Sequence, residues 1–330
     1  MKKLFYSLFF LQCCIIINGC HTSDPEIDPS GPFPAEDNFN LVFNLYQGSS
    51  GSKMADHLIL QVKPYLRDND SITVFTGNGF DDESEKDTAL TPPGPTNTFS
   101  IQKVNTSEVN SRLALLKTGL ATIDIHYVVY TAGIEHIRQV IDGLNSASKA
   151  QLSGIAYGYE PYYLYEFEFD FNKTLTHITD ASLLIRQEGF LAGSGPAGRF
   201  LRDNELKNYK WNYGEIAQLL DETIIQTQTI LRQDFQAGNL DLPEYRRILK
   251  RLKDQLEQYP NTCKVYPQIT INDGQAATGG NVNAAPLEYC IEAIKVIKEF
   301  GFPGASIWYG GTEAVMANML NLVKAARDHD

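Results

Sequence analysis

Glu160, an acid at the end of an apolar segment, is the first side chain in this sequence that could do chemistry. Residues 153–158 are mostly small or apolar and indicate a buried parallel strand, and Pro161 marks the end of regular structure. Tyr162 follows directly. An acid at the carboxyl end of such a strand, with aromatic rings around it, is typical of a carbohydrate site at the mouth of an α/β barrel. The alternative is a strand-end glutamate that is simply solvated.

Hydrolysis of a glycosidic bond by two carboxylates needs a second acid about 5 to 9 Å from the first. Asp273 is the best candidate, because it lies just past a strand predicted over residues 264–271. Asp82 and Asp124 come next. The competing interpretation of Asp273 is that Asn-Asp-Gly at residues 272–274 forms an ordinary turn.

Polar and aromatic side chains share one parity in several predicted strands, and the opposite parity is mostly aliphatic. Since side chains alternate along a strand, this parity predicts a common polar interior in a barrel. Hydrogen bonds that fill the core are the alternative explanation, and His126 taken alone fits a satisfied core histidine. The residues predicted to contact a substrate are Asn44, Tyr46, His126, Tyr130, Tyr162, Gln268, Asn272 and Trp308.

Strands alternate with helices along the chain, which favours a parallel sheet with right-handed crossovers. Residues 213–235 are ambiguous, because their apolar spacing fits a long helix while β-branched residues fit a strand over 223–230. With that eighth strand the fold class is α/β, a (β/α)₈ TIM-type barrel. A doubly wound sheet is the competitor, but no P-loop Lys-Ser/Thr pair follows the first strand. The seven clear strands are predicted near residues 41–46, 72–77, 123–130, 153–158, 190–195, 264–271 and 305–309.

Residues 153–160 resemble the fourth-strand motif D-G-x-D-x-D-x-E of family-18 glycoside hydrolases, the chitinase and endo-N-acetylglucosaminidase barrels. Trp308 is similar to the tryptophan on the barrel floor of that family. The resemblance implies that Glu160 is the general acid that protonates the leaving glycosidic oxygen. The pair Glu160-Pro161 is also similar to the Asn-Glu-Pro acid of other barrel glycosidases, with Tyr159 in the place of Asn.

Three acids of the family-18 motif are absent, since Ser153, Ala156 and Gly158 stand in their places. In that family the acid at the position of Gly158 orients the substrate N-acetyl group, which acts as the nucleophile. The sequence therefore leaves two functions open. One is a glycoside hydrolase with Glu160 as acid, and the other is a carbohydrate-binding protein that kept the barrel and lost the chemistry.

The net charge of −12 argues against nucleic acid as a partner, and a neutral glycan is easier to accommodate. A hydrophobic content of 43% with 21% charged residues indicates a globular chain. We expect no cofactor, and no metal-ligand spacing is present. Cys263 and Cys290 are predicted to lie at opposite ends of a strand–helix unit, too far apart for a disulfide, so two buried thiols are expected.

Residues 1–19 resemble the signal peptide of a bacterial lipoprotein. Lys2 and Lys3 precede an apolar run over 4–17, and the segment ends at Cys20, the expected site of lipidation. Residues 20–37 are polar and rich in proline, which predicts a flexible tether, and 38–330 would form a single barrel domain. The expected location is the outer membrane or cell surface of a Gram-negative bacterium, with the membrane reached through lipid on Cys20. A plain secretory signal is the alternative.

Overall fold

The computed structural model describes residues 38–46, 48–76, 104–131, 134–158, 171–198, 200–202, 210–273 and 283–327. All of these belong to the unit Asn38–Asp330. No helix in these ranges is long and apolar enough to cross a membrane. The predicted signal peptide, the tether and Cys20 lie outside the described residues.

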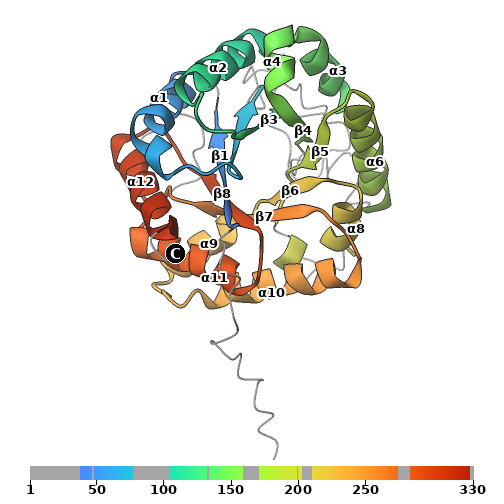
Figure 1. Cartoon of the computed structure of the whole chain (residues 1–330). Helices are drawn as coiled ribbons and strands as arrows, with labels where there is room; N and C mark the ends of the chain where they lie inside the picture. The colour runs from blue at the N-terminus through green and yellow to red at the C-terminus, as the bar shows by residue number, and fades with distance from the viewer. Residues whose placement is uncertain are drawn as a thin grey trace, which may run out of the picture. The chain divides into compact units, whose positions relative to one another are not determined.

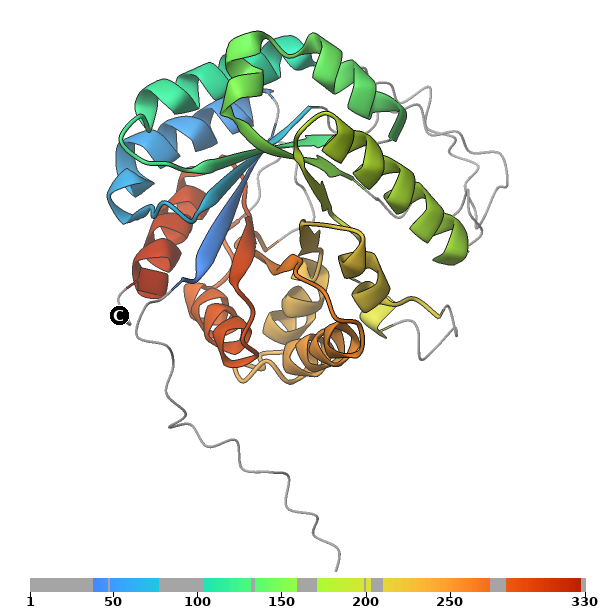
Figure 2. The ribbon, with the colours of Figure 1, turned by 45° about the vertical axis from the view of Figure 1, so that its right-hand side comes forward.

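Eight parallel strands close into a barrel in the order in which they occur in the chain, and helices surround it (Figures 1 and 2). This confirms the predicted (β/α)₈ barrel. The ring closes where β8 pairs with β1, with Val42 opposite Ser306. The strands are β1 (Asn40–Leu45), β2 (Ser71–Phe75), β3 (His126–Thr131), β4 (Leu152–Tyr157), β5 (Leu191–Ser194), β6 (Glu222–Ile225), β7 (Lys264–Thr270) and β8 (Gly304–Trp308).

The eighth strand, β6, lies inside the segment that the sequence left ambiguous. Its β-branched residues Thr223, Ile224 and Ile225 form the strand, as their preference for extended backbone predicts. The strand ends at Ile225 rather than at residue 230, because α9 begins at Gln228. The long helix that apolar spacing also allowed is therefore wrong, and the segment contains helix, strand and helix in turn.

The helices cover the outer face of the sheet (Figure 1). Outward-facing strand residues such as Leu41, Phe43 and Leu45 are fully buried in one large cluster with helix residues such as Met54 and Leu322. Removing this apolar surface from water stabilises the layered arrangement. The helices are α1 (Gly48–His57), α2 (Thr106–Gly119), α3 (Ile134–Gly143), α4 (Ser146–Gln151), α6 (Phe171–Gln187), α8 (Tyr213–Gln218), α9 (Gln228–Gln236), α10 (Pro243–Gln258), α11 (Leu287–Glu299) and α12 (Glu313–Arg327), with single π and 3-10 turns at Leu58–Val62 and Lys63–Tyr65.

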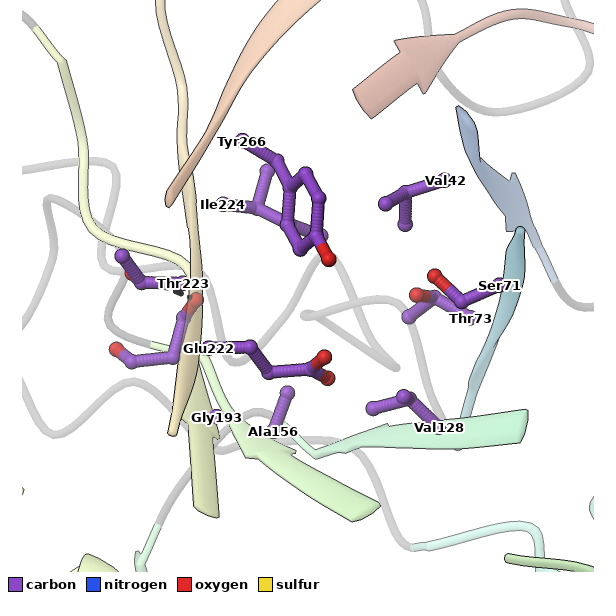
Figure 3. Close-up of a pocket in the computed structure, with 11 residues that line it drawn as sticks. Val42, Ser71, Thr73, Val128, Ala156, Gly193, Glu222, Thr223, Ile224 and Tyr266 are labelled. Carbon is purple, nitrogen blue, oxygen red and sulfur yellow. Dashed lines mark hydrogen bonds between the residues drawn. The ribbon is translucent and has the colours of Figure 1, made fainter. Parts of the chain in front are cut away.

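Strand residues of the opposite parity point inward and fill the barrel in small separate clusters. Val42, Ile224 and Tyr266 form one of them (Figure 3). Val128 packs in a second cluster, toward the carboxyl ends of the strands. The alternation predicted from the sequence thus places aliphatic residues outside and a mixed set of residues inside.

Both cysteines of the described chain are free thiols. Cys290 in α11 is buried as predicted, whereas Cys263, which directly precedes β7, is partly exposed, so the prediction that it is buried is wrong. Burial raises the pKa of Cys290 to about 12, so this thiol stays protonated and packs as a small apolar group.

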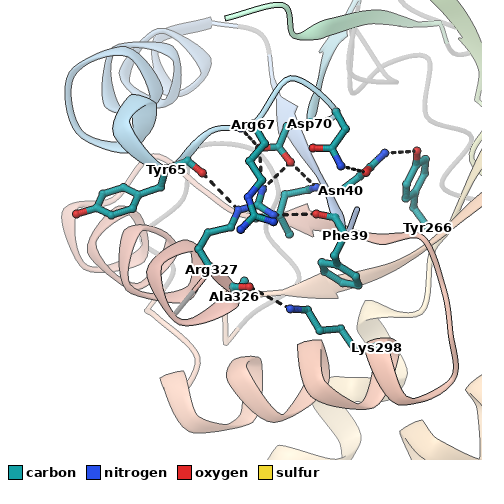
Figure 4. Close-up of polar contacts among 11 residues, drawn as sticks. Phe39, Asn40, Tyr65, Arg67, Asp70, Tyr266, Lys298, Ala326 and Arg327 are labelled. Carbon is teal, nitrogen blue, oxygen red and sulfur yellow. Dashed lines mark hydrogen bonds and ion pairs between the residues drawn. The ribbon is translucent and has the colours of Figure 1, made fainter. Parts of the chain in front are cut away.

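A buried ion pair fastens the last helix to the start of the sheet (Figure 4). Arg327, at the end of α12, donates from Nη2 to both carboxylate oxygens of Asp70, at 2.6 and 2.8 Å. Asp70 also accepts the backbone N–H groups of Leu41 and Arg67, at 2.8 and 2.9 Å. Arg327 Nη1 donates to the carbonyl of Phe39 at 2.8 Å. Both charges are thus hydrogen-bonded to groups that define where β1 and β2 begin.

We expect Arg327→Met to lower the free energy of unfolding by about 3–5 kcal/mol, because it leaves the Asp70 carboxylate buried without its counter-charge. Urea titration followed by circular dichroism measures this. The matched control is Lys250→Ala on α10, whose i,i+4 pair with Asp254 is exposed, so its loss should change the free energy of unfolding far less. Equal costs for the two variants would contradict the structural role of the buried pair.

Candidate functional site

A polar layer crosses the barrel interior between β1, β7 and β8. Asn44 Nδ2 donates to Ser306 Oγ at 2.8 Å and to the carbonyl of Ile307 at 2.8 Å. Gln268 Nε2 donates to the same serine oxygen at 3.3 Å. The structure therefore brings Asn44 and Gln268 together, as their parity predicts. Both are buried and bound to the protein itself, so in this arrangement they support the floor of the site.

Asn272 connects the end of β7 to the residues that follow β8. Its Oδ1 accepts the backbone N–H of Gly310 at 3.1 Å, and the side chain is fully buried. Asp273 is next in the chain and is partly exposed at the same end of the barrel. Its charge acts on Arg232 of α9, whose pKa burial lowers and Asp273 raises. Asp273 thus lies at the carboxyl-end mouth, close to a cation.

Four aromatic rings form a continuous row along the carboxyl ends of β8, β1, β2 and β3. Trp308 packs edge-on against Tyr46 at 4.8 Å between ring centroids, and Tyr46 stacks on Phe75 at 5.0 Å. Phe75 in turn lies 4.5 Å from Tyr130. We call these four residues the aromatic wall. Tyr46 and Tyr130 are buried, whereas Trp308 and Phe75 are partly exposed.

Phe75 was missing from the residues predicted to contact a substrate. Its signal was present in the sequence, because Phe75 shares the parity of the inward-facing Ser71 and Thr73 on β2. An aromatic residue at the last inward position of a barrel strand lies at the mouth by geometry alone.

The ring of Tyr130 fills the space over two glycines on the neighbouring strands. A Cβ placed on Gly195 would lie 2.6 Å from Tyr130 Oη, and one on Gly158 would overlap the edge of the same ring and lie 2.8 Å from the carbonyl oxygen of Thr131. Any side chain at Gly158 would therefore have to displace Tyr130. The position at which the family-18 motif carries an acid is occupied here by a tyrosine ring from β3.

His126 lies at the opposite end of the barrel from the other predicted residues. It is the first residue of β3, is exposed, and its Nδ1 lies 3.2 Å from Ser153 Oγ. Asp124 is also exposed and precedes the strand. The parity of His126 was predicted correctly, but β3 begins at residue 126 rather than 123, so this residue is at the amino end. The structure does not bring His126 or Asp124 to the mouth that holds Tyr130.

Glu160 and Tyr162, together with Asp82, lie outside the described residues. β4 ends at Tyr157, and the described segment ends at Gly158, two residues before Glu160. Among the described residues, no group of three His, Cys, Asp or Glu side chains gathers as metal ligands.

The sequence interpretation missed one carboxylate inside the barrel, that of Glu222. It is the first residue of β6, and its side chain points into the interior beside Ala156 and Gly193 (Figure 3). Burial raises the pKa of Glu222 to about 7, Lys264 opposes this rise, and Asp221 adds to it. Parity along β6 would have revealed the residue, but the bounds of that strand were uncertain.

Comparison with known proteins identifies the architecture and not a family. No protein-family model matches the sequence, and no curated protein is significantly similar to it. The structure is similar to the following three solved structures. They are the spore cortex-lytic enzyme SleL of Bacillus megaterium QM B1551 (TM-score 0.52, 12% identity, 89% of this chain and 75% of that chain), a GH18 chitinase from Pseudoalteromonas aurantia (0.51, 14%, 86% and 99%), and the PgaB glycoside hydrolase domain from Bordetella bronchiseptica (0.52, 9%, 86% and 96%). At these identities the likeness establishes the TIM-barrel fold.

We expect Glu222 to make stability fall as the pH rises. The native state keeps the proton on Glu222 up to about pH 7, whereas an ordinary glutamate loses it near 4.5. The stabilisation that Glu222 provides is therefore fully present below about pH 4.5 and is lost as the pH rises to about 7. For a partly exposed group, the free energy of unfolding should fall by roughly 2–3 kcal/mol over this range. Urea unfolding at pH 5 and pH 8 measures the difference.

Glu222→Gln should remove this part of the pH dependence and make the protein relatively more stable at pH 8. Glu257→Gln on the exposed face of α10 is the matched control and should retain the slope of the wild type. An unchanged slope in Glu222→Gln would show that the carboxyl is solvated.

Proposed function

We propose that this protein acts on a glycan at the carboxyl-end mouth of its barrel, as a hydrolase in which Glu160 is the general acid. The observation that carries the proposal is the aromatic wall above a layer of amides and a hydroxyl. Sugar rings present apolar C–H faces and polar edges, and aromatic faces beside hydrogen-bonding groups are complementary to both. The named activities of the structurally similar barrels agree with a glycan as ligand.

The catalytic part of the proposal assigns Asp273 as the second carboxylate. Asp273 lies past the end of β7, at the end of the barrel toward which β4 runs, and a TIM barrel uses this end for catalysis. Asp124 is not retained, because it precedes β3 at the other end. Asp273 would act as nucleophile or as base toward water, depending on its separation from Glu160.

A specific observation favours a second function, that of a carbohydrate-binding protein without hydrolytic activity. Tyr130 takes the space above Gly158, so this strand cannot place a carboxylate there to orient a substrate N-acetyl group. Substrate-assisted hydrolysis of the family-18 kind would lack its orienting acid. Such a protein would hold sugars by stacking on Trp308 and Phe75 and by hydrogen bonds.

We expect Glu160→Gln to abolish hydrolysis while binding changes less than about threefold, because glutamine keeps the shape of the side chain but cannot transfer a proton. Wild type and variant are compared on a panel of soluble oligosaccharides that begins with chitooligosaccharides. Released reducing ends report turnover, and calorimetry reports binding. Binding without turnover in the wild type would establish the second function and reject the enzyme. No binding to any glycan would reject both.

Trp308→Ala separates these outcomes from a general loss of fold. Removing the ring should weaken binding of the same oligosaccharides about tenfold, equivalent to ~1.4 kcal/mol, in an enzyme and in a binding protein alike. Tyr65→Ala is the matched control, since this aromatic residue is likewise partly buried but lies outside the barrel, under Lys324 of α12. It should leave the affinity unchanged.

We also propose that the mature chain is anchored in the membrane by lipid on Cys20, on the evidence of residues 1–20. More than one acyl chain is needed for stable attachment, and a diacylated, N-acylated cysteine provides enough. In a Gram-negative host, Cys20→Ala should release the protein from the membrane fraction or leave the precursor uncleaved. Ser23→Ala, three residues further on, is the control. Attachment of Cys20→Ala equal to that of the wild type would exclude the lipoprotein signal.

A further inference from the structure

The amino-terminal end of the barrel holds a polar cavity of about 230 Å³, at the opposite end from the aromatic wall. A volume of this size is far above the roughly 15 Å³ that one water requires and below the roughly 300–1,000 Å³ of drug-sized sites. The cavity therefore suits a small polar molecule. Six of its lining residues are the first residues of their strands: Asn40, Ser71, His126, Leu191, Glu222 and Lys264.

Two side chains of opposite charge in this lining, the partly exposed Glu222 and the exposed Lys264, have no ion-pair or hydrogen-bond partner within the described chain. Glu222 and Lys264 lie opposite each other in the register of β6 and β7, so both reach the same space. They influence each other electrostatically but form no ion pair, and neither makes a side-chain hydrogen bond to a described residue. The neighbouring Asp221 differs, because Arg186 binds both of its oxygens at 3.1 Å and the N–H of Ala192 adds a bond of 2.8 Å.

A chain of hydrogen-bonded polar groups also lines the cavity. Asn69 Nδ2 donates to Asn40 Oδ1 at 2.6 Å, and Asn40 Nδ2 donates to the hydroxyl oxygen of Tyr266 at 3.2 Å (Figure 4). The hydroxyl proton of Tyr266 remains available, and its oxygen faces the space into which Glu222 points (Figure 3). A ligand here would meet the Tyr266 hydroxyl and the Asn69 amide already held in place, so binding would not have to order these side chains.

We propose that this amino-terminal cavity binds a small zwitterion of the amino-acid type, with its ammonium group on Glu222 and its carboxylate on Lys264. Such a ligand supplies both missing counter-charges at once. A partly buried carboxylate without a partner carries a desolvation cost, which a charged hydrogen bond from the ligand offsets. The site is distinct from the proposed glycan site, and the proposal does not depend on whether a glycan binds at the mouth.

Other small ligands match the lining less well. A divalent cation needs several carboxylates, and Asp221 is already bound to Arg186. A phosphate would meet a single unpaired lysine with a carboxylate beside it. A neutral sugar could bond to Asn69 and Tyr266 but would leave both charges without counter-charges.

The test is a thermal-shift screen of the full chain at pH 8 with the twenty common amino acids, followed by calorimetry on those that stabilise it. At this pH the Glu222 carboxyl is ionised, since its pKa is about 7. Acetate, methylammonium and glucose serve as half-ligands that carry one charge or none. We expect at least one amino acid to bind, and each half-ligand to bind at least tenfold more weakly.

Glu222→Gln and Lys264→Gln should each reduce the affinity for that amino acid at least tenfold, and Lys250→Gln on the exposed face of α10 should not. Circular dichroism at pH 8 confirms that the variants are folded, and Glu222→Gln is expected to be at least as stable as the wild type there. The proposal is overturned if no amino acid binds or if a half-ligand binds as tightly as the amino acid does. It is also overturned if both variants bind that amino acid with wild-type affinity.

Discussion

Closure of the sheet between β8 and β1 is the constraint on which the other features of this structure depend. Three contacts at different heights involve this seam. Asp70 and Arg327 fasten the last helix beside it at the amino end, Asn44 and Ser306 cross it in the interior, and Tyr46 packs against Trp308 at the carboxyl end. The first is a buried charge pair, which specifies one arrangement because any other leaves a charge without a partner. A shift of β8 relative to β1 would therefore disturb both the polar layer in the interior and the aromatic wall at the mouth.

The interior changes character along the barrel axis. Amides and a hydroxyl form the layer near the mouth, Val42 and Ile224 an apolar middle, and Glu222 and Lys264 a charged lower end. Native interiors are usually packed to the density of organic crystals, with few voids larger than a water molecule. The lower end instead holds the cavity of about 230 Å³. In a TIM barrel this amino-terminal end normally serves stability. The cavity there is the reason to propose a second binding site.

Sequence patterns predicted the fold and the inward face well, because both depend on local alternation. The parity of Asn44 and Gln268 follows from the period of two, and the order of the strands follows from their alternation with helices. Height along the axis could not be predicted in the same way. His126 has the expected parity and lies at the wrong end, because the start of β3 is set by pairing with β2 and not by its own residues. Glu222 was missed for the related reason that a four-residue strand between two helices gives too short a pattern.

The packing of Tyr130 over Gly158 and Gly195 couples three strands that sequence analysis treats separately. An aspartate at position 158 would meet the tyrosine ring, and removal of the ring alone would open a void in the aromatic wall. Neither single substitution leaves a well-packed protein, so we expect replacements at positions 130 and 158 to be tolerated only as a pair.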